Sequence, residues 1–101
     1  MAHLDVYPMP GRAQRGYVVD VQANLLAGLA TRVVVPLMKE GAVRSVAAGL
    51  NPVFNIKGQP HVMLTQALAA VPSRELREVA GSLQDQRETV LRALDLLLTG
   101  V

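Results

Sequence analysis

Apolar and polar residues follow a strand-like pattern near the start of the chain. Residues 4–7 alternate between apolar and polar, and the prolines and glycine of residues 8–11 end the pattern, because proline lacks the N–H that a paired strand donates. Residues 16–22 are rich in β-branched and aromatic side chains, although their alternation is imperfect. The two segments predict antiparallel strands joined as a long hairpin.

A third strand is predicted at residues 32–37, where three consecutive valines indicate a buried segment. Pro36 places this strand near an edge or a bulge, since proline is excluded from the middle of a paired sheet. Residues 39–51 lose periodicity and contain Gly41 and Gly49, so we expect a mobile loop there with one helical turn.

The clearest hairpin joins residues 52–56 to residues 61–65, because Gly58 between them supplies the positive φ that a tight connection demands. Residues 69–72 predict one short edge strand. From Ser73 onward apolar residues recur with helical spacing. This spacing predicts a loose turn over residues 73–80, an interruption at Gly81 and Ser82, and a helix from about Gln84 to Leu98. The whole pattern is typical of a small β-rich α+β domain with one C-terminal amphipathic helix.

The length of 101 residues and the hydrophobic content of 50% suit one domain, residues 1–101, with a modest core. No apolar stretch approaches the roughly 18 residues that a membrane span requires. The first residues lack the pattern of a secretory signal, and the chain has no cysteine. We therefore expect a soluble protein of the reducing cytoplasm with no membrane partner.

The net charge of +2 does not indicate a dedicated nucleic-acid surface, and two tyrosines and one phenylalanine are too few to stack on single strands. The excess of basic over acidic residues lies in about the first sixty residues, where acidic residues are few. We expect that half to attract an acidic peptide. Its basic residues are Arg12, Arg15, Arg32, Lys39, Arg44 and Lys57.

Few residues are candidates for catalysis. His3 and His61 are the only histidines, too few for a zinc site without cysteine, and His61 reads as a partly exposed sheet residue. No phosphate-binding glycine loop and no Gly-x-Ser-x-Gly elbow occur, and the acids of the helical segment alternate with arginines as on a solvated face. We expect no metal, no cofactor and no enzymatic activity, and by elimination an interaction module.

Several segments resemble the CcdB family of toxins. Residues 19–26, Val-Asp-Val-Gln-Ala-Asn-Leu-Leu, and 31–37, Thr-Arg-Val-Val-Val-Pro-Leu, resemble the family's Val-Asp-Val-Gln core and Val-Ile-Pro-Leu strand. Residues 50–56 resemble its Leu-x-Pro-Val-x-x-Ile, residues 63–72 resemble its turn ending in Val-Pro, and the final Gly-Val resembles its terminus. The likeness covers essentially the whole chain, with the blocks in the same order.

The resemblance implies an SH3-like, partly open barrel of antiparallel strands with a small accessory sheet and one C-terminal α-helix, assembled as a homodimer. It implies a type II toxin that binds DNA gyrase A and traps the complex in which DNA is cleaved. The resemblance implies that the toxin contacts DNA only indirectly, through gyrase and the antitoxin. The resemblance also implies a CcdA-like antitoxin, whose disordered acidic segment folds as it binds and neutralises the toxin.

Carried over residue by residue, the resemblance assigns two sets of contacts. Thr99 departs from the family, because the best-known toxins carry a tryptophan there, and Leu98 replaces a phenylalanine. For Leu25, Leu26 and Leu98 an ordinary core position is the alternative. The expected gyrase-binding residues are Leu25, Leu26, Asp95, Leu98, Thr99, Gly100 and Val101, and the expected antitoxin-binding residues are Arg12, Arg15, Val43 and Arg44.

Two other functions stay open at this point. An endoribonuclease similar to the MazF toxins would need an arginine and a hydroxyl at the scissile phosphate, and Arg32 with Thr31 is the candidate pair. Against it, the early glycine-containing loop of those nucleases is absent. The other is a homologue that has lost gyrase poisoning, because Thr99 replaces the family tryptophan.

Overall fold

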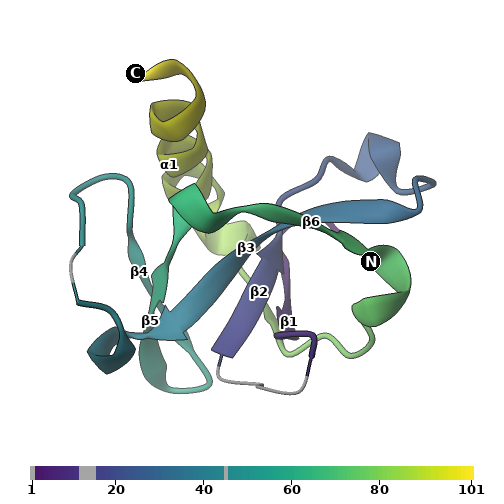
Figure 1. Ribbon diagram of the computed structural model, residues 1–101, viewed down its shortest axis with the longest axis horizontal. Coiled ribbons are helices and arrows are strands. Elements are labelled where there is room, and N and C mark those ends of the chain that lie inside the picture. Colours follow the sequence, from purple (N-terminus) through teal and green to yellow (C-terminus); the bar gives the residue numbers. More distant parts are fainter. Residues whose placement is uncertain (1, 12–15, 45) are drawn as a thin grey trace.

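In the computed structural model, which describes residues 2–11, 16–44 and 46–101, the strands form one antiparallel sheet that curls into a nearly closed barrel (Figure 1). One C-terminal helix, α1 (Arg87–Thr99), stands against it. This architecture confirms the barrel and the terminal helix expected from the sequence. The strands are β1 (Asp5–Pro8), β2 (Gly16–Asp20), β3 (Thr31–Lys39), β4 (Val53–Ile56), β5 (Gln59–Met63), β6 (Ala69–Pro72) and β7 (Gly81–Ser82).

Strand β3 lies in the middle of the sheet, so of the two positions expected from Pro36, an edge or a bulge, the edge is wrong. It pairs with β2 on one side and with β5 and β6 on the other. Pro36 is tolerated because the pairing with β6 ends at Val34 and that with β5 begins at Leu37. The Pro36 carbonyl faces this junction, where it accepts a hydrogen bond of 2.9 Å from the Leu64 N–H, and the missing donor costs no ladder bond.

Two predicted hairpins are confirmed. Strands β1 and β2 pair antiparallel, with Val6 opposite Val19. Strands β4 and β5 join through Lys57 and Gly58, which have φ values of 54° and 83°. Positive φ at both central residues is the signature of a type I′ turn, whose twist matches that of the strands it joins.

The remaining short elements follow the sequence in part. Strand β6 forms as predicted and joins the same sheet through β3 alone, off the main strand path. Strand β7 was not expected, because it has only two residues; it pairs with β1 at the far end of the sheet. The five connecting 3-10 turns of the described residues are η1 (Asn24–Leu26), η2 (Glu40–Ala42), η3 (Thr65–Ala67), η4 (Ser73–Glu75) and η5 (Gln84–Gln86).

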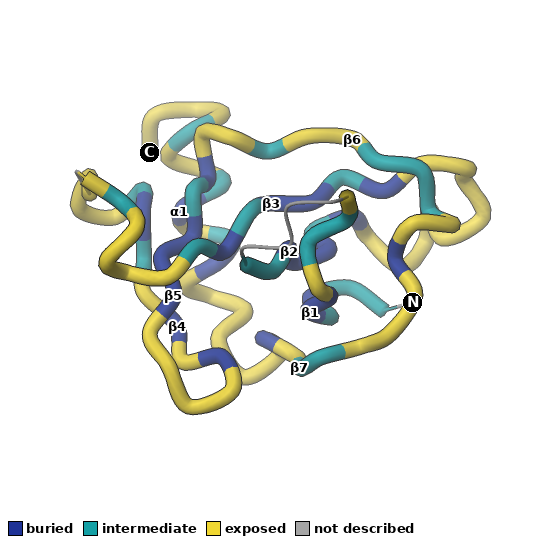
Figure 2. The backbone as a smooth tube through the Cα atoms, turned by 60° about the horizontal axis from the view of Figure 1, so that its bottom comes forward, coloured by how far each residue is buried: buried dark blue, intermediate teal, exposed yellow. Residues whose placement is uncertain are grey.

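The central strands bury both faces, and this explains their imperfect alternation. Neighbours in sequence point to opposite faces of a strand. One face contributes to the main core, which α1 completes with Val90 and Ala93, both 0% exposed. The other face supplies Tyr7, Val18 and Val34 to a smaller cluster closed by Leu76. Figure 2 shows the buried residues gathered along these strands and the exposed ones along the connections.

Candidate functional site

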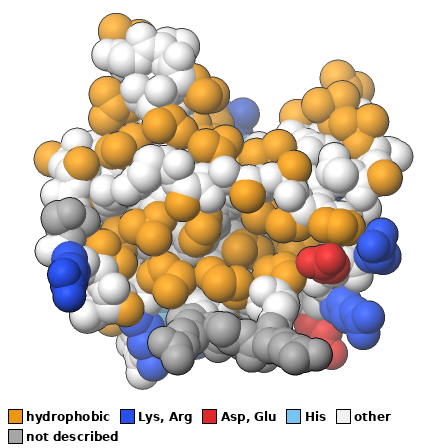
Figure 3. Space-filling view, viewed as in Figure 1, with side chains coloured by type: hydrophobic (Ala, Val, Ile, Leu, Met, Phe, Trp, Pro, Cys, Tyr) orange, Lys and Arg blue, Asp and Glu red, His pale blue; other side chains and the backbone are white. Residues whose placement is uncertain are grey.

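Two apolar projections rise from the same end of the molecule (Figure 1). The lobe, residues 23–30, contains η1 and follows β2. The helix tip, residues 95–101, consists of the last turn of α1 and the two residues after it. Figure 3 shows hydrophobic side chains over both projections and over the face between them. Leucines exposed in clusters on a small protein commonly mark a binding surface.

The lobe carries its leucines outward. Leu25 is 92% exposed, Leu29 52% and Leu26 47%, and no residue of η1 is buried. The lobe is fastened at its base by Gln22, whose Nε2 donates to the carbonyls of Leu26 and Thr31 at 3.0 and 3.1 Å. Its leucines are therefore available to a partner rather than to the core.

The helix tip ends in a left-handed cap. Gly100 has a φ of +81°, and its N–H donates to the carbonyls of Leu96 and Asp95 at 3.0 and 3.2 Å. Thr99 Oγ1 donates to the Asp95 carbonyl at 2.8 Å. The cap stops the helix and leaves Val101 91% exposed.

The expected gyrase-binding residues are all exposed, and they fall into two groups. Asp95, Leu98, Thr99, Gly100 and Val101 share the helix tip, whereas Leu25 and Leu26 lie on the lobe. The alternative of an ordinary core position is wrong for Leu25, Leu26 and Leu98, the last being 69% exposed. Sequence reasoning missed Leu29. The signal that could have found it is the apolar run of residues 25–30 around Gly28, which has neither a strand nor a helix period and is therefore not typical of a core segment.

The residues expected to bind the antitoxin are less completely placed. Arg12 and Arg15 lie outside the described residues. Val43 is half-buried and Arg44 exposed; both follow η2, at the lower left of Figure 1 and away from the two projections.

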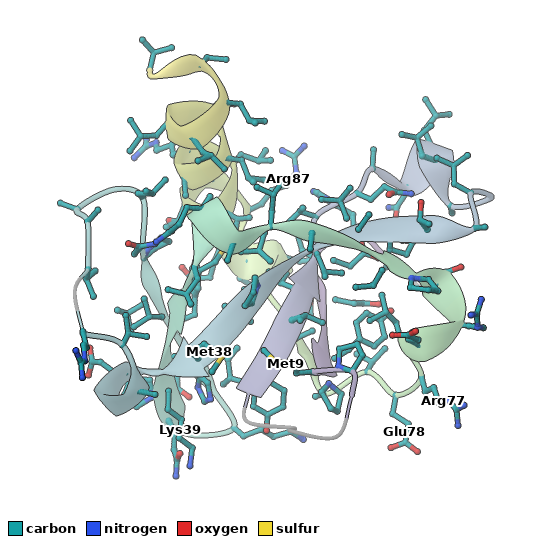
Figure 4. All side chains as sticks on the ribbon, viewed as in Figure 1. Met9, Met38, Lys39, Arg77, Glu78 and Arg87 are labelled. Atoms are coloured by element: carbon teal, nitrogen blue, oxygen red, sulfur yellow. The ribbon has the colours of Figure 1, made fainter. Side chains whose placement is uncertain are left out.

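A groove opens where the loops after β1 and β3 leave the sheet, and we call it the loop groove. At its floor the ring of His61 meets that of Tyr17 edge-on, with 5.3 Å between ring centroids. His61 is 2% exposed, so the expectation of a partly exposed residue was wrong; its Nδ1–H donates to the Gln59 carbonyl at 2.9 Å. The groove is lined by Pro8, Gly16, Tyr17, Met38, Lys39, Ala42 and His61, of which Figure 4 labels Met38 and Lys39.

Arg32 is structural, so the nuclease pair of Thr31 and Arg32 is wrong. The guanidinium is fully buried and donates to Asp20 Oδ2 from Nε at 2.9 Å and from Nη2 at 2.5 Å. Since no face of it reaches solvent, it cannot meet a phosphate. In the described part of the chain, no group of three His, Asp or Glu side chains is arranged to hold a metal ion.

Tyr7 lies beside this ion pair. Its hydroxyl and the Nη1 of Arg32 are both buried without a hydrogen-bond partner among the described residues. Burial raises the pKa of the Tyr7 hydroxyl, and the carboxylates of Asp5 and Asp20 raise it further. The phenol is therefore neutral at physiological pH.

None of the helices in the described ranges combines the length and the apolar character needed to cross a membrane.

Comparison with known proteins bears on the whole chain. The family model described as CcdB protein matches residues 3–100. A search of curated proteins finds no match to this sequence. The family match confirms the resemblance seen in the residue blocks.

Proposed function

The chain belongs to the CcdB family, whose toxins poison DNA gyrase in toxin–antitoxin systems without enzymatic chemistry, and from this premise we propose that the lobe and the helix tip bind gyrase A. The observation that carries the proposal is the exposure of both apolar projections at one end of the molecule. A toxin that acts by occupying a cavity needs shape and apolar surface rather than a nucleophile.

The proposed contacts have enough apolar surface to drive binding. Burying one leucine or valine side chain completely stabilises a complex by about 1.5–3 kcal/mol before the costs of association. Leu25, Leu98 and Val101 are all at least two-thirds exposed in the free chain. Together with Leu26, they offer a target four exposed aliphatic side chains.

We propose further that the protein acts as a twofold homodimer. The apolar face between the projections fits a second copy of the chain, and exposed Ala69 and Ala70 of β6 belong to the surface available there. A twofold dimer would present two copies of the helix tip, which suits a target that itself contains two copies of gyrase A.

Thr99 is expected to weaken the toxin relative to its best-known relatives. A central aromatic anchor contributes about 2 kcal/mol or more to an interface, and each 1.4 kcal/mol is tenfold in affinity. The threonine hydroxyl is engaged by the Asp95 carbonyl, so it offers a partner neither an aromatic ring nor a free hydroxyl proton. We propose that this protein traps gyrase in its cleaved complex only at higher concentrations than the relatives that carry the tryptophan.

A CcdA-like acidic antitoxin is proposed to bind at the opposite end, over the loop groove and the basic residues around it. Lys39 lines this groove, and exposed Arg44 follows the adjacent turn η2. Arg12, Arg15 and Val43 complete the proposed contact. Because this end leaves both projections uncovered, the antitoxin can engage a toxin already seated on gyrase, in the cytoplasm where gyrase works.

The experiment is a DNA cleavage assay with purified gyrase, plasmid and increasing toxin. Wild-type protein should accumulate linear, protein-linked DNA. Leu25→Ser should lose this activity without a fall in melting temperature, because Leu25 is exposed. A chain shortened by Gly100 and Val101 should also lose it, with only the small loss of stability that follows from removing the cap of α1. Val79→Ser is the matched control, since Val79 is 57% exposed and lies outside both projections. Equal activity of all four proteins would refute the assignment.

A further inference from the structure

We propose that Gln22 is a positioning residue for gyrase binding: its side-chain amide fixes the lobe so that Leu25 and Leu26 are presented in one orientation. The inference rests on the proposed function, because it takes the lobe to be a gyrase contact. The inference goes beyond the proposed function because it assigns the geometry of the lobe to the side chain of Gln22. This side chain is only 8% exposed and so touches no partner itself.

The lobe has no packing of its own to hold it. Every residue from 23 to 31 is exposed, and Ala23, the N-cap residue of η1, makes no side-chain capping hydrogen bond. Within the lobe, the backbone bonds are three short-range turns, from the N–H groups of Leu26, Ala27 and Leu29. An exposed turn of this kind is marginal in isolation, since nothing offsets the entropy lost on ordering it.

The Gln22 amide replaces that missing packing. Its Nε2 bridges Leu26, inside the lobe, to Thr31, where β3 begins, and its Oε1 accepts the Val33 N–H at 3.1 Å. The middle of the lobe and the residue that follows it are therefore tied to a single planar group. The Ala30 carbonyl is held separately, by the N–H and the Oγ of Ser73 at 2.9 and 3.0 Å. Removing the Gln22 amide would leave the carbonyls of the exposed Leu26 and Thr31 to water and the Val33 N–H without its side-chain partner, so that nothing on residue 22 would fix the orientation of the lobe.

Gln22 is in turn held by the buried ion pair. Its backbone N–H donates to Asp20 Oδ1 at 3.0 Å, while Asp20 Oδ2 accepts from Arg32. On the other side the His3 N–H donates to Asn24 Oδ1 at 2.8 Å, at the start of η1. Of the groups that hold the lobe, Gln22 is the one that links it to fully buried side chains, those of Asp20 and Arg32.

The test uses Gln22→Leu, which keeps the side-chain bulk and removes all three hydrogen bonds, and Gln22→Glu, which keeps the acceptor for Val33 and removes the donors. Binding to a gyrase A fragment and to an acidic antitoxin peptide is measured by titration calorimetry, with backbone amide exchange by nuclear magnetic resonance. We expect gyrase affinity to fall tenfold or more, antitoxin affinity to stay within twofold, and exchange at the amides of Leu26, Ala27 and Leu29 to rise at least tenfold.

Phe54→Leu, in the far hairpin β4–β5, is the control for a general loss of stability. Binding by each variant is measured at the same interval below its own melting temperature. If Phe54→Leu weakens gyrase binding as much as Gln22→Glu does, or if neither Gln22 variant speeds exchange in the lobe, the positioning role is overturned. Leu25→Ser separates the two claims. If that variant binds gyrase normally, or if wild-type protein does not bind at all, the proposed function fails, and the exchange data still decide whether Gln22 orders the lobe.

Discussion

The ion pair between Asp20 and Arg32 is predicted to be coupled, so that removing one partner is far worse than removing both. Both side chains are 0% exposed, and Arg32 makes two hydrogen bonds to one carboxylate oxygen. The perturbation is a double-mutant cycle of Asp20→Asn, Arg32→Met and the pair together. Asparagine keeps an oxygen for the Gln22 N–H, and methionine fills part of the space of the arginine.

The expected magnitude follows from the burial. An isolated charge left in a protein interior costs about 3–5 kcal/mol, whereas replacing a whole buried pair by apolar or neutral groups of similar size is often neutral. A domain of this size has a free energy of unfolding of about 5–15 kcal/mol, so Arg32→Met and Asp20→Asn each remove a large share of it. The double variant should be at least as stable as either single variant, so that it regains about 3 kcal/mol or more over the sum of the single losses.

Urea unfolding followed by circular dichroism measures this cycle. With a dependence on urea of about 1–3 kcal/mol per molar, each single substitution should lower the midpoint by about 2 M. All proteins are compared at one concentration, because dimerisation would stabilise the folded state by mass action. Single losses below about 1 kcal/mol, or strictly additive losses, would refute the view that these are two desolvated charges holding one another.

Three further predictions concern single side chains. Tyr7→Phe should raise the free energy of unfolding by about 1 kcal/mol at neutral pH, because it removes a buried hydroxyl without a partner. The folded-state pKa of Tyr7 lies above its usual 10.0, so the tyrosine ionises first in the unfolded chain, and the free energy of unfolding of the wild type falls as pH rises past 10.0. Denaturation measured above that pH should show a smaller fall for Tyr7→Phe. Gly100→Ala should cost about 1 kcal/mol in thermal unfolding and also weaken gyrase binding, because the φ of +81° that ends α1 strains any residue with a Cβ; an unchanged melting temperature would contradict the cap. Thr99→Trp should raise gyrase affinity at least tenfold by restoring an anchor, and calorimetry showing no gain would argue that the helix tip does not enter the target.

The elements that sequence reasoning recovered are those governed by nearby residues. The hairpin around Gly58 forms because a two-residue turn depends on the φ values of its own residues. The predicted helix is confirmed over Arg87–Thr99, because the spacing reports a period within one segment, although its expected first residues form the turn η5. The order of the blocks was enough to indicate the family. For the proposed contacts, sequence alone supplied Leu25, Leu26 and the last residues of the chain.

What the sequence left open depends on contacts between distant segments. Pro36 sits in a central strand because β5 and β6 happen to divide one side of β3 between them, and no local pattern encodes that division. Arg32 and His61 are buried because other strands cover them. In the same way, only the fold decides that the lobe and the helix tip, far apart in the chain, emerge at one end: burial and orientation are properties of packed elements, whereas period and turn chemistry are properties of the chain.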